Sequence, residues 1–296
     1  MKITSLLPLA AALTLLAQTV TAGEFKTRVV ASGLDHPTGI VAGGDELYFT
    51  EVPNPGTPNA GNGVKRLDLC DWSIDTINSG EPEPVNITLD RHGQIYWTCK
   101  SAGVILTQDD DGATMPVLGG LSKPSGIAID RWGRIFFTLI PTPGVPGTMG
   151  GSNNVSVLTR DGVSVVNMGE PEPSDIAVSR KGDLYWTCKT AGVILERDTH
   201  GAVSVLLNGL NKPVGIALNR QGDRLYWTEV PTPGVNGANG GQNKVWELNL
   251  RTMKKTLVNA GDPEPTDITV DRDGTLYWTC TSAGVIVEAR RERRRH

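Results

Sequence analysis

The segment Gly80-Glu81-Pro82-Glu83-Pro84, followed after a short run by Tyr96-Trp97-Thr98-Cys99, decides the fold of this 296-residue chain. Both motifs return twice, in the same order and each time ahead of an Ala-Gly-Val-Ile sequence. The turn motifs of the further copies begin at Gly169 and Gly261, and their aromatic motifs span Tyr185–Cys188 and Tyr277–Cys280. Such self-similarity predicts an architecture built from copies of one supersecondary unit.

A second motif series alternates with the first and describes the same kind of unit. Its turns are Gly-Leu-x-x-Pro sequences, and each precedes a β-rich run and an aromatic strand such as Tyr48-Phe49-Thr50. Both series give a turn, a strand, a charged hairpin and an aromatic strand within about 40–45 residues, which is the length of a four-stranded propeller blade. The chain is therefore predicted to be all-β, a six-bladed β-propeller made of three two-blade repeats. The blades start near Gly33, Gly80, Gly120, Gly169, Gly209 and Gly261.

The ring is predicted to be closed by the N-terminal strand in the last blade. That blade has room for only three strands of its own, and the segment Phe25–Ser32 matches the outer strands of earlier blades in character and in the Gly that follows it. Joining both chain ends in one sheet removes an unpaired edge, which would otherwise invite aggregation.

The first residues have the pattern of a secretory signal peptide. A basic Lys2, an apolar run from Leu6 to Leu16 and the small-residue sequence Val20-Thr21-Ala22 predict cleavage after Ala22. The apolar run is too short to cross a bilayer, so no membrane span is expected. The chain is expected to be secreted or to stay in the secretory pathway. The expected domains are a signal peptide over 1–22, the propeller over 23–289 and a basic, solvated tail over 290–296.

Two glycosylation sequons fit this route, at Asn86 and Asn154. Asn154 is the stronger candidate because it lies in a Gly-rich loop, whereas Asn86 begins a predicted buried strand. The repeated cysteines occupy equivalent places about 120° apart on the ring, too far to bridge one another, and no disulfide is expected. They are Cys99, Cys188 and Cys280.

Composition excludes several partners and reactions. The formal net charge of −4 gives no electrostatic reason to expect nucleic-acid binding. The chain has no Gly-x-Ser-x-Gly nucleophile elbow, no phosphate-cradling glycine loop and no cysteine pairs with zinc spacing. A small-molecule substrate is the expected partner, and the oligomeric state stays open.

The aromatic strands resemble the Tyr-Trp-Thr-Asp repeats of low-density-lipoprotein-receptor propellers, with Cys where that family has Asp. The wider pattern covers essentially the whole mature chain and resembles the NHL and SMP-30/gluconolactonase-like six-bladed propellers. In scale and organisation the chain is also similar to the fungal hetero-Diels–Alderases of tropolone-sesquiterpenoid biosynthesis. These resemblances imply the fold and leave the chemistry to the site.

The loops that enter the inner strands of a propeller surround one mouth of its central channel, and the polar residues of the repeats are expected there. The expected substrate-binding residues are Asn86, Lys123, Asp175 and Lys212. The candidate catalytic residues are His36, Glu51, Glu83, Glu229, Glu264 and Asp267. Converging acids and cations shift one another's pKa values and can move protons. The alternative is structural, because an Asp at a strand start can cap backbone N–H groups.

Departures from the repeat favour one neighbourhood at this mouth. His36 stands where the other odd blades have Lys, and Asn86 stands where the other even blades have an acid. The preferred site combines these two residues with Glu51 and Glu83. A second assignment places Asp267 and Glu264 beside Glu229. Three long Gly- and Pro-rich connections, over 53–63, 141–154 and 231–243, are expected to wall the site.

The resemblance to SMP-30-like lactonases implies a divalent cation, Ca²⁺ or Mg²⁺, held by oxygen ligands in the channel. Asn86, Asp175 and Asp267 offer a three-oxygen set, but the first inner strand lacks that family's Glu. The odd blades supply only glycine at the matching positions, namely Gly39, Gly126 and Gly215. No cofactor is therefore favoured, although Ca²⁺ or Mg²⁺ stays an alternative.

Three functions are compatible with these features. The first, implied by the fungal resemblance, is a hetero-Diels–Alderase of secondary-metabolite biosynthesis that joins a tropolone quinone methide to a sesquiterpene alkene. The second is an SMP-30-like, metal-dependent lactonase or ester hydrolase. The third is a non-enzymatic propeller that binds a partner. The incomplete ligand set and the uneven loops favour the first.

Overall fold

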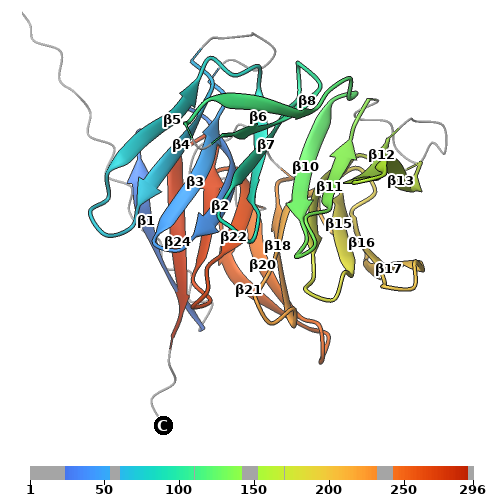
Figure 1. The fold of residues 1–296 in the computed structure, drawn as a ribbon. Helices are drawn as coiled ribbons and strands as arrows, with labels where there is room; N and C mark the ends of the chain where they lie inside the picture. The colour runs from blue at the N-terminus through green and yellow to red at the C-terminus, as the bar shows by residue number, and fades with distance from the viewer. Residues whose placement is uncertain are drawn as a thin grey trace, which may run out of the picture.

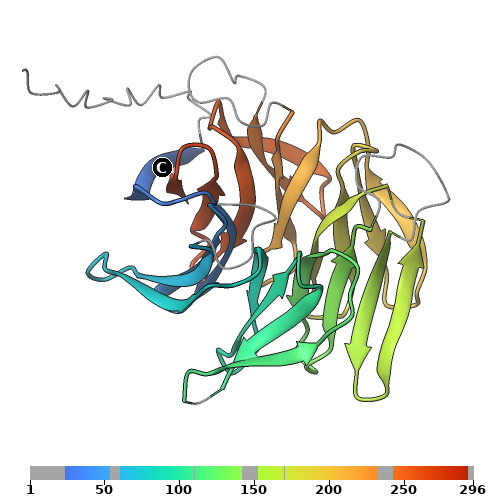
Figure 2. The same cartoon turned by 90° about the horizontal axis from the view of Figure 1, so that it is seen from above.

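The computed structural model describes residues 24–53, 61–109, 111–141, 153–169, 171–231 and 243–292. In these ranges the regular structure consists of strands, which form six four-stranded antiparallel sheets arranged in a ring (Figures 1 and 2). The predicted all-β, six-bladed β-propeller is confirmed. None of the described segments forms a helix able to cross a membrane. The predicted signal peptide lies outside the described residues.

The strands of the first three blades follow one another in chain order, from the channel outward. Blade 1 contains β2 (Pro37–Gly43), β3 (Glu46–Glu51), β4 (Gly63–Asp68) and β5 (Ile74–Ser79). Blade 2 contains β6 (Pro84–Leu89), β7 (Ile95–Cys99), β8 (Val104–Gln108) and β9 (Thr114–Leu118). Blade 3 contains β10 (Pro124–Ile129), β11 (Ile135–Leu139), β12 (Asn154–Thr159) and β13 (Gly162–Met168).

The next two blades repeat this order, and the last blade takes its fourth strand from the N-terminus. Blade 4 contains β14 (Pro173–Val178), β15 (Leu184–Cys188), β16 (Val193–Arg197) and β17 (Val203–Leu207). Blade 5 contains β18 (Pro213–Leu218), β19 (Arg224–Glu229), β20 (Lys244–Asn249) and β21 (Lys254–Ala260). Blade 6 contains β22 (Pro265–Val270), β23 (Leu276–Cys280), β24 (Val285–Arg291) and β1 (Phe25–Ser32).

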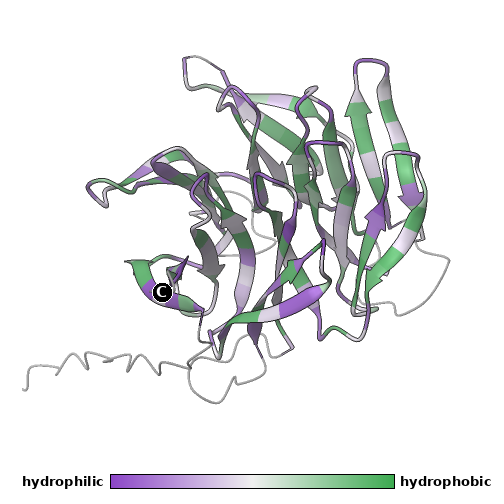
Figure 3. Ribbon diagram, turned by 90° about the horizontal axis from the view of Figure 1, so that it is seen from below, coloured by the Kyte–Doolittle hydropathy of each residue, from purple (hydrophilic) through white to green (hydrophobic). Residues whose placement is uncertain are grey.

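The core lies between neighbouring blades, where the aromatic residues of the second strands are fully buried. Trp97, Trp186, Trp227 and Trp278 occupy this position in four blades, and Phe49 and Phe137 occupy it in the other two. Figure 3 shows apolar residues along the strands and polar residues in many of the turns. Because each sheet packs on the next, the ring buries apolar surface continuously without a single central core.

Every inner strand begins with the same backbone device. The residue before its first proline has a φ between 52° and 58°, and its carbonyl oxygen accepts the N–H of the residue just after the second strand. Non-glycine residues adopt this left-handed conformation at a cost of about 1–2 kcal/mol, so the surrounding hydrogen bonds must hold it. The six residues are His36, Glu83, Lys123, Glu172, Lys212 and Glu264.

Ring closure by the N-terminal strand is confirmed. β1 pairs antiparallel with β24 on the outer side of blade 6, and the two ends of the chain lie side by side in Figure 2. The expected tail begins later than predicted, because Arg290 and Arg291 belong to β24. Arg291 stays in the sheet because its guanidinium lies over the Phe25 ring, 4.5 Å from the centroid, and pairs with two carboxylates.

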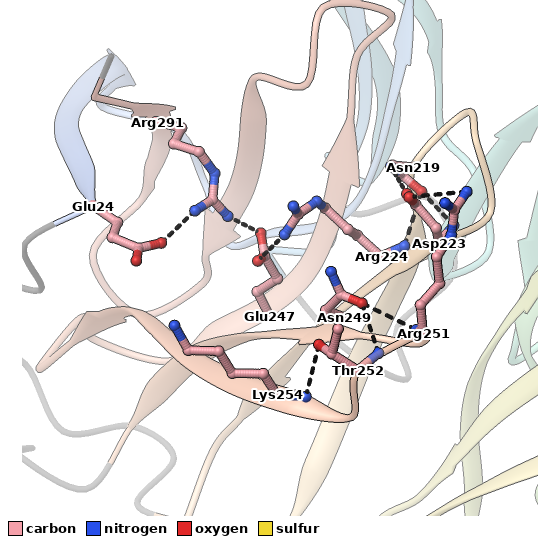
Figure 4. Close-up of polar contacts among 10 residues, drawn as sticks. All are labelled: Glu24, Asn219, Asp223, Arg224, Glu247, Asn249, Arg251, Thr252, Lys254 and Arg291. Carbon is pink, nitrogen blue, oxygen red and sulfur yellow. Dashed lines mark hydrogen bonds and ion pairs between the residues drawn. The ribbon is translucent and has the colours of Figure 1, made fainter. Parts of the chain in front are cut away.

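These carboxylates form an ionic clasp that ties the closing strands to blade 5 (Figure 4). Glu247 on β20 is 2% exposed and lies between Arg224 of β19 and Arg291 of β24. Arg291 also pairs with Glu24, which precedes β1. Both chain ends are therefore joined to the neighbouring blade through one buried carboxylate.

We expect Glu247→Gln to lower the free energy of unfolding by about 1–3 kcal/mol, because it leaves two partly buried guanidinium groups without their shared counter-charge. Urea denaturation measures this loss. The control is Glu292→Gln at the same seam, where Lys26 and Glu292 form an exposed ion pair, and it should change stability by less than about 0.5 kcal/mol. Equal effects of the two substitutions would contradict the assignment of the clasp.

Candidate functional site

The upper face is the face at which the inner strands begin, and its turn residues alternate in charge around the channel mouth. The odd blades contribute the exposed side chains of His36, Lys123 and Lys212. The even blades contribute Glu83, Glu172 and Glu264, which are buried or half-buried. These glutamates accept hydrogen bonds from hydroxyl groups of their own blade's short hairpin, at Ser101, Thr190 and Ser282. The glutamates therefore hold hairpins in place.

Glu51 and Glu229 lie inside blades 1 and 5 and do not line the channel cavity described below. Glu51 is 2% exposed, pairs with Lys65 at 2.6 Å and accepts the backbone N–H of Asp35. Glu229 pairs with Lys255 at 3.6 Å and accepts the indole N–H of Trp227. Each of the two buried carboxylates is therefore paired with a lysine and a hydrogen-bond donor of its own part of the ring.

The first acid of the Gly-Glu-Pro-Glu-Pro turn has a structural role that sequence reasoning missed. The indole N–H of Trp97 donates to Glu81 at 3.3 Å, and that of Trp278 donates to Asp262 at 2.7 Å. Burial raises the pKa of Asp262. Blade 3 has a phenylalanine in place of the tryptophan and Leu139 where blade 5 has its acid. Blade 1 keeps Glu51 although it has Phe49 at the tryptophan position, so the repeats alone show the pairing of tryptophan with acid only in part.

Asn86, Asp175 and Asp267 come together at the channel, as the third residue of their inner strands. The side-chain N–H of Asn86 donates to Asp175 Oδ1 at 3.1 Å. The two oxygens of Asp175 accept the N–H groups of Ile176 and Ile216, both at 2.8 Å. Asp267 likewise accepts those of Ile268 and Ile40. Each aspartate therefore joins its own inner strand to that of the next blade.

Glycine on the odd blades makes this approach possible. A Cβ atom on Gly39 would lie 2.6 Å from Asn86 Cα, one on Gly126 would lie 2.5 Å from Asp175 Cα, and one on Gly215 would lie 2.6 Å from Asp267 Cα. Real Cβ atoms do not come so close to a backbone, so the odd blades cannot carry a side chain at these positions. The polar groups of the channel must come from the even blades.

The pKa values of both aspartates are raised. Burial raises the pKa of Asp175 to about 7 and raises that of Asp267 well above its ordinary value. Their mutual hydrogen bond lowers the pKa of Asp175 and raises that of Asp267. These directions are satisfied when a protonated Asp267 donates to an ionised Asp175, as in other carboxyl pairs that cannot both ionise.

A cavity of about 180 Å³ extends below this carboxyl pair. Its lining starts at the level of Asn86, Asp175 and Asp267 and continues along the inner strands to Ile129, Val178 and Leu218 at their lower ends. None of the described residues nearer the upper face lines it. The carboxyl pair therefore lies at the upper limit of the described lining, whose other side chains are mainly apolar.

The structure brings together only part of the predicted site. In the described residues no hydrogen bond or ion pair joins any two of His36, Glu51, Glu83 and Asn86. Glu264 and Glu229 bond within separate blades. Lys123 is exposed, and Lys212 donates to the carbonyl oxygen of Pro231. The long connections lie mostly outside the described residues.

The two sequons have different surroundings. Asn86 is 8% exposed and bonded to Asp175 in the channel, so the folded chain leaves no space for a glycan on it. Asn154 stands at the start of β12, and its side-chain oxygen accepts a hydrogen bond from Ser156 at 2.7 Å. Glycosylation at Asn154 stays a prediction. All four cysteines are free thiols.

The channel donors suit a proton better than a divalent cation. Ca²⁺ takes six to eight oxygen ligands. Here every carboxylate oxygen of Asp175 and Asp267 already accepts a backbone N–H, and Asn86 presents its amide nitrogen to Asp175. The described residues contain no group of three or more His, Cys, Asp or Glu placed to hold a metal.

Comparisons with known proteins agree with the architecture. No family model matches the chain. A low-density lipoprotein receptor-related protein 1 from Pyricularia oryzae is 25% identical over 271 residues, which cover 78% of this chain and 84% of that protein.

Solved structures of the same shape include enzymes. A gluconolactonase from Xanthomonas campestris has a TM-score of 0.69 and 16% identity, covering 90% of each chain. A streptogramin B lyase has a TM-score of 0.61 and 18% identity, covering 91% of this chain and 99% of its own. These neighbours share the fold. They do not by themselves assign a reaction.

We expect the folded chain to lose stability as pH rises from about 5 to about 7. Both aspartates bind a proton more tightly in the folded state than in the unfolded chain, because burial raises the pKa of Asp175 to about 7 and raises that of Asp267. The contribution of Asp175 is complete below the unfolded pKa of about 4 and is lost as pH rises through about 7. With Asp267 acting in the same direction, the slope in urea denaturation should be at least about 1 kcal/mol per pH unit.

Asp175→Asn should reduce this slope, whereas Asp161→Asn in an exposed turn should leave it unchanged. A wild-type stability that is constant or increases over this pH interval would contradict the raised pKa values of the pair.

Proposed function

We propose that this chain is an enzyme of the secretory pathway that breaks a C–O bond in a small organic molecule by proton transfer from the Asp175–Asp267 pair. The observation that carries the proposal is the pair itself, two buried carboxyl groups with raised pKa values at the upper end of a cavity. Acids with shifted pKa values in a cavity lined by apolar side chains are typical of catalytic sites.

The pair contains both an acid and a base. Asp267 donates its proton to the oxygen of the leaving group as the C–O bond breaks, and that oxygen keeps the bonding electron pair. Asp175 takes a proton from water or from an acidic group of the substrate. Proton exchange between the two carboxyl groups then restores the starting state, so the cycle needs no external oxidant or reductant.

The fold neighbours support chemistry of this class. One is named a gluconolactonase and another a streptogramin B lyase, so chains of similar fold include proteins named for lactone and lyase reactions. For a lactone, Asp175 would activate water and Asp267 would protonate the departing alkoxide. This is a metal-free form of the lactonase alternative, because the described donors do not fit a cation.

The second candidate is the intermolecular hetero-Diels–Alder reaction, which the same pair could start. Loss of water from a hydroxymethyl tropolone is also an acid-assisted C–O cleavage, and it gives the quinone methide that reacts with an alkene. Pockets for drug-sized ligands are about 300–1,000 Å³. Because the channel cavity is about 180 Å³, the sesquiterpene alkene would have to bind outside it.

We expect Asp267→Asn to lower kcat by about 10²–10⁴-fold on the true substrate, the range for loss of a general acid. The assay incubates the mature protein with a lactone panel, and separately with a hydroxymethyl tropolone plus a humulene-type alkene. Each arm is run with and without EDTA. Ring opening identifies the first candidate and a cycloadduct identifies the second.

The matched control is Glu229→Gln, which removes a buried acid outside the cavity and should keep kcat while lowering stability. Activity that survives Asp267→Asn would contradict proton transfer by the pair. Activity abolished by EDTA would replace this mechanism with a metal-dependent one. Inactivity in every arm, with a partner bound instead, would favour the non-enzymatic propeller.

A further inference from the structure

The lower face, where the inner strands end, carries a β-turn of repeated geometry. In blades 2 to 6 the N–H of a glycine donates to the carbonyl oxygen three residues earlier, at 2.9–3.3 Å. The first residue of each turn is Asp, Ser or Asn, and its side chain accepts further N–H groups of the turn. The second residue is an exposed arginine in all five blades, at Arg91, Arg131, Arg180, Arg220 and Arg272.

The fold does not require arginine at this corner. The next position holds a different residue in each of these blades, namely His92, Trp132, Lys181, Gln221 and Asp273, so the turn accepts many side chains. In the described part of the chain Arg180, Arg220 and Arg272 make no hydrogen bond or ion pair through their side chains. Arg91 donates to His92 and Arg131 lies over the Trp132 ring, so the arginines without an internal partner in that part are those of blades 4 to 6. Their repetition points to a partner outside the chain.

The charge is concentrated on one side of this face. Blades 3 to 5 carry Arg131, Arg180, Lys181 and Arg220, four exposed cations without an ion pair in the described structure, which we call the basic arc. On the opposite side, blades 6 and 1 have acids in or next to their turns, at Asp45, Glu46, Asp271 and Asp273, and Arg272 stands between the last two. The contrast lets the basic arc attract an anion although the chain is acidic as a whole.

The ring of Trp132 holds one guanidinium of the basic arc, that of Arg131, in place. This ring is 52% exposed and lies 4.2 Å from the guanidinium carbon of Arg131 and 5.1 Å from that of Arg134. Arg134 is already paired with Asp130 at 2.6 Å, whereas Arg131 is held by the ring alone. A guanidinium held in this way loses less conformational freedom when it binds a carboxylate.

The basic arc borders the cavity that contains the carboxyl pair. Ile129, Val178 and Leu218 line the lower end of the cavity and lie within two residues of Arg131, Arg180 and Arg220. Asp175 precedes Arg180 by five residues, about 16 Å along an extended strand. A molecule with an anionic end and a reactive end could therefore contact the arc and the pair together.

We propose that the substrate enters the channel from the lower face and is an anionic small molecule whose carboxylate binds the basic arc. The proposal deepens the proposed function, on which it rests for the reaction, but the anion site stands without it. The bound carboxylate orients the substrate so that its C–O bond meets Asp267 at the upper end of the cavity.

Binding of citrate to the mature protein at low ionic strength tests the anion site, by isothermal calorimetry and by the fluorescence of Trp132. We expect Arg180→Gln to weaken binding about tenfold and Arg180→Gln with Arg220→Gln to weaken it about a hundredfold, because each removes a charge-assisted contact. Added salt should weaken wild-type binding. The matched control is Arg160→Gln, an exposed arginine in the outer β12–β13 turn of the same face, which should leave citrate binding unchanged.

Equal citrate affinity in Arg180→Gln and Arg160→Gln would overturn the anion site. Much tighter binding of polyglutamate than of citrate would also overturn it, because the arc would then dock an acidic protein segment. If Arg180→Gln reduces citrate binding while Asp267→Asn leaves turnover unchanged, the proposed function is rejected and the anion site is kept.

The direction of access is tested separately with Ala217→Leu, which enlarges a residue that lines the cavity between the arc and the pair and also packs against the neighbouring blade. Citrate binding should persist while turnover falls at least about tenfold. Ala217→Val is the milder variant if Ala217→Leu does not fold. Unchanged turnover in the folded variant would reject access from the lower face.

Discussion

The contact between a glycine of one inner strand and the backbone of the next sets how closely the blades approach the channel. With Gly39, Gly126 and Gly215 on the odd blades, the neighbouring strands come within the distance that any Cβ would occupy. At that spacing the inward N–H groups of Ile40 and Ile216 have no strand partner. A buried donor without an acceptor is costly, and the aspartates of the even blades supply the acceptors. The acid pair is therefore a consequence of how the ring closes on itself.

The same geometry explains why the third member of the set is an amide. Three carboxyl groups in this space would have to bury a second negative charge or bind a second proton. Asn86 instead donates an N–H to Asp175 and adds no further charge to the channel. The same two carboxyl groups thus serve the fold and the chemistry. Their oxygens accept backbone N–H groups, and their pKa values are raised.

The repeats were enough to predict the number of blades, their starts and the closure by Phe25–Ser32, because each unit contains its own turn and strand signals. The site was harder to predict. Asn86, Asp175 and Asp267 were all identified, but their contact spans three blades and depends on how far the inner strands lie apart, which no local pattern encodes. Glu51 and Glu229 were expected at the channel mouth because each comes at the end of an aromatic strand. Only the structure shows that their partners are Lys65 and Lys255 inside the blade.

The two faces of the ring differ in what their polar residues must do for the fold. On the upper face the turn residues have strained backbones, and the glutamates among them are bonded to neighbouring hairpins. On the lower face the turns are capped by Asp, Ser or Asn, so the arginines at the corners of blades 4 to 6 make no contact that the turn needs. Side chains without a structural role are the ones a repeated scaffold can use for recognition. The cavity agrees with this division, because its described lining begins at Asp175 and Asp267 and continues toward the arginine-bearing turns below.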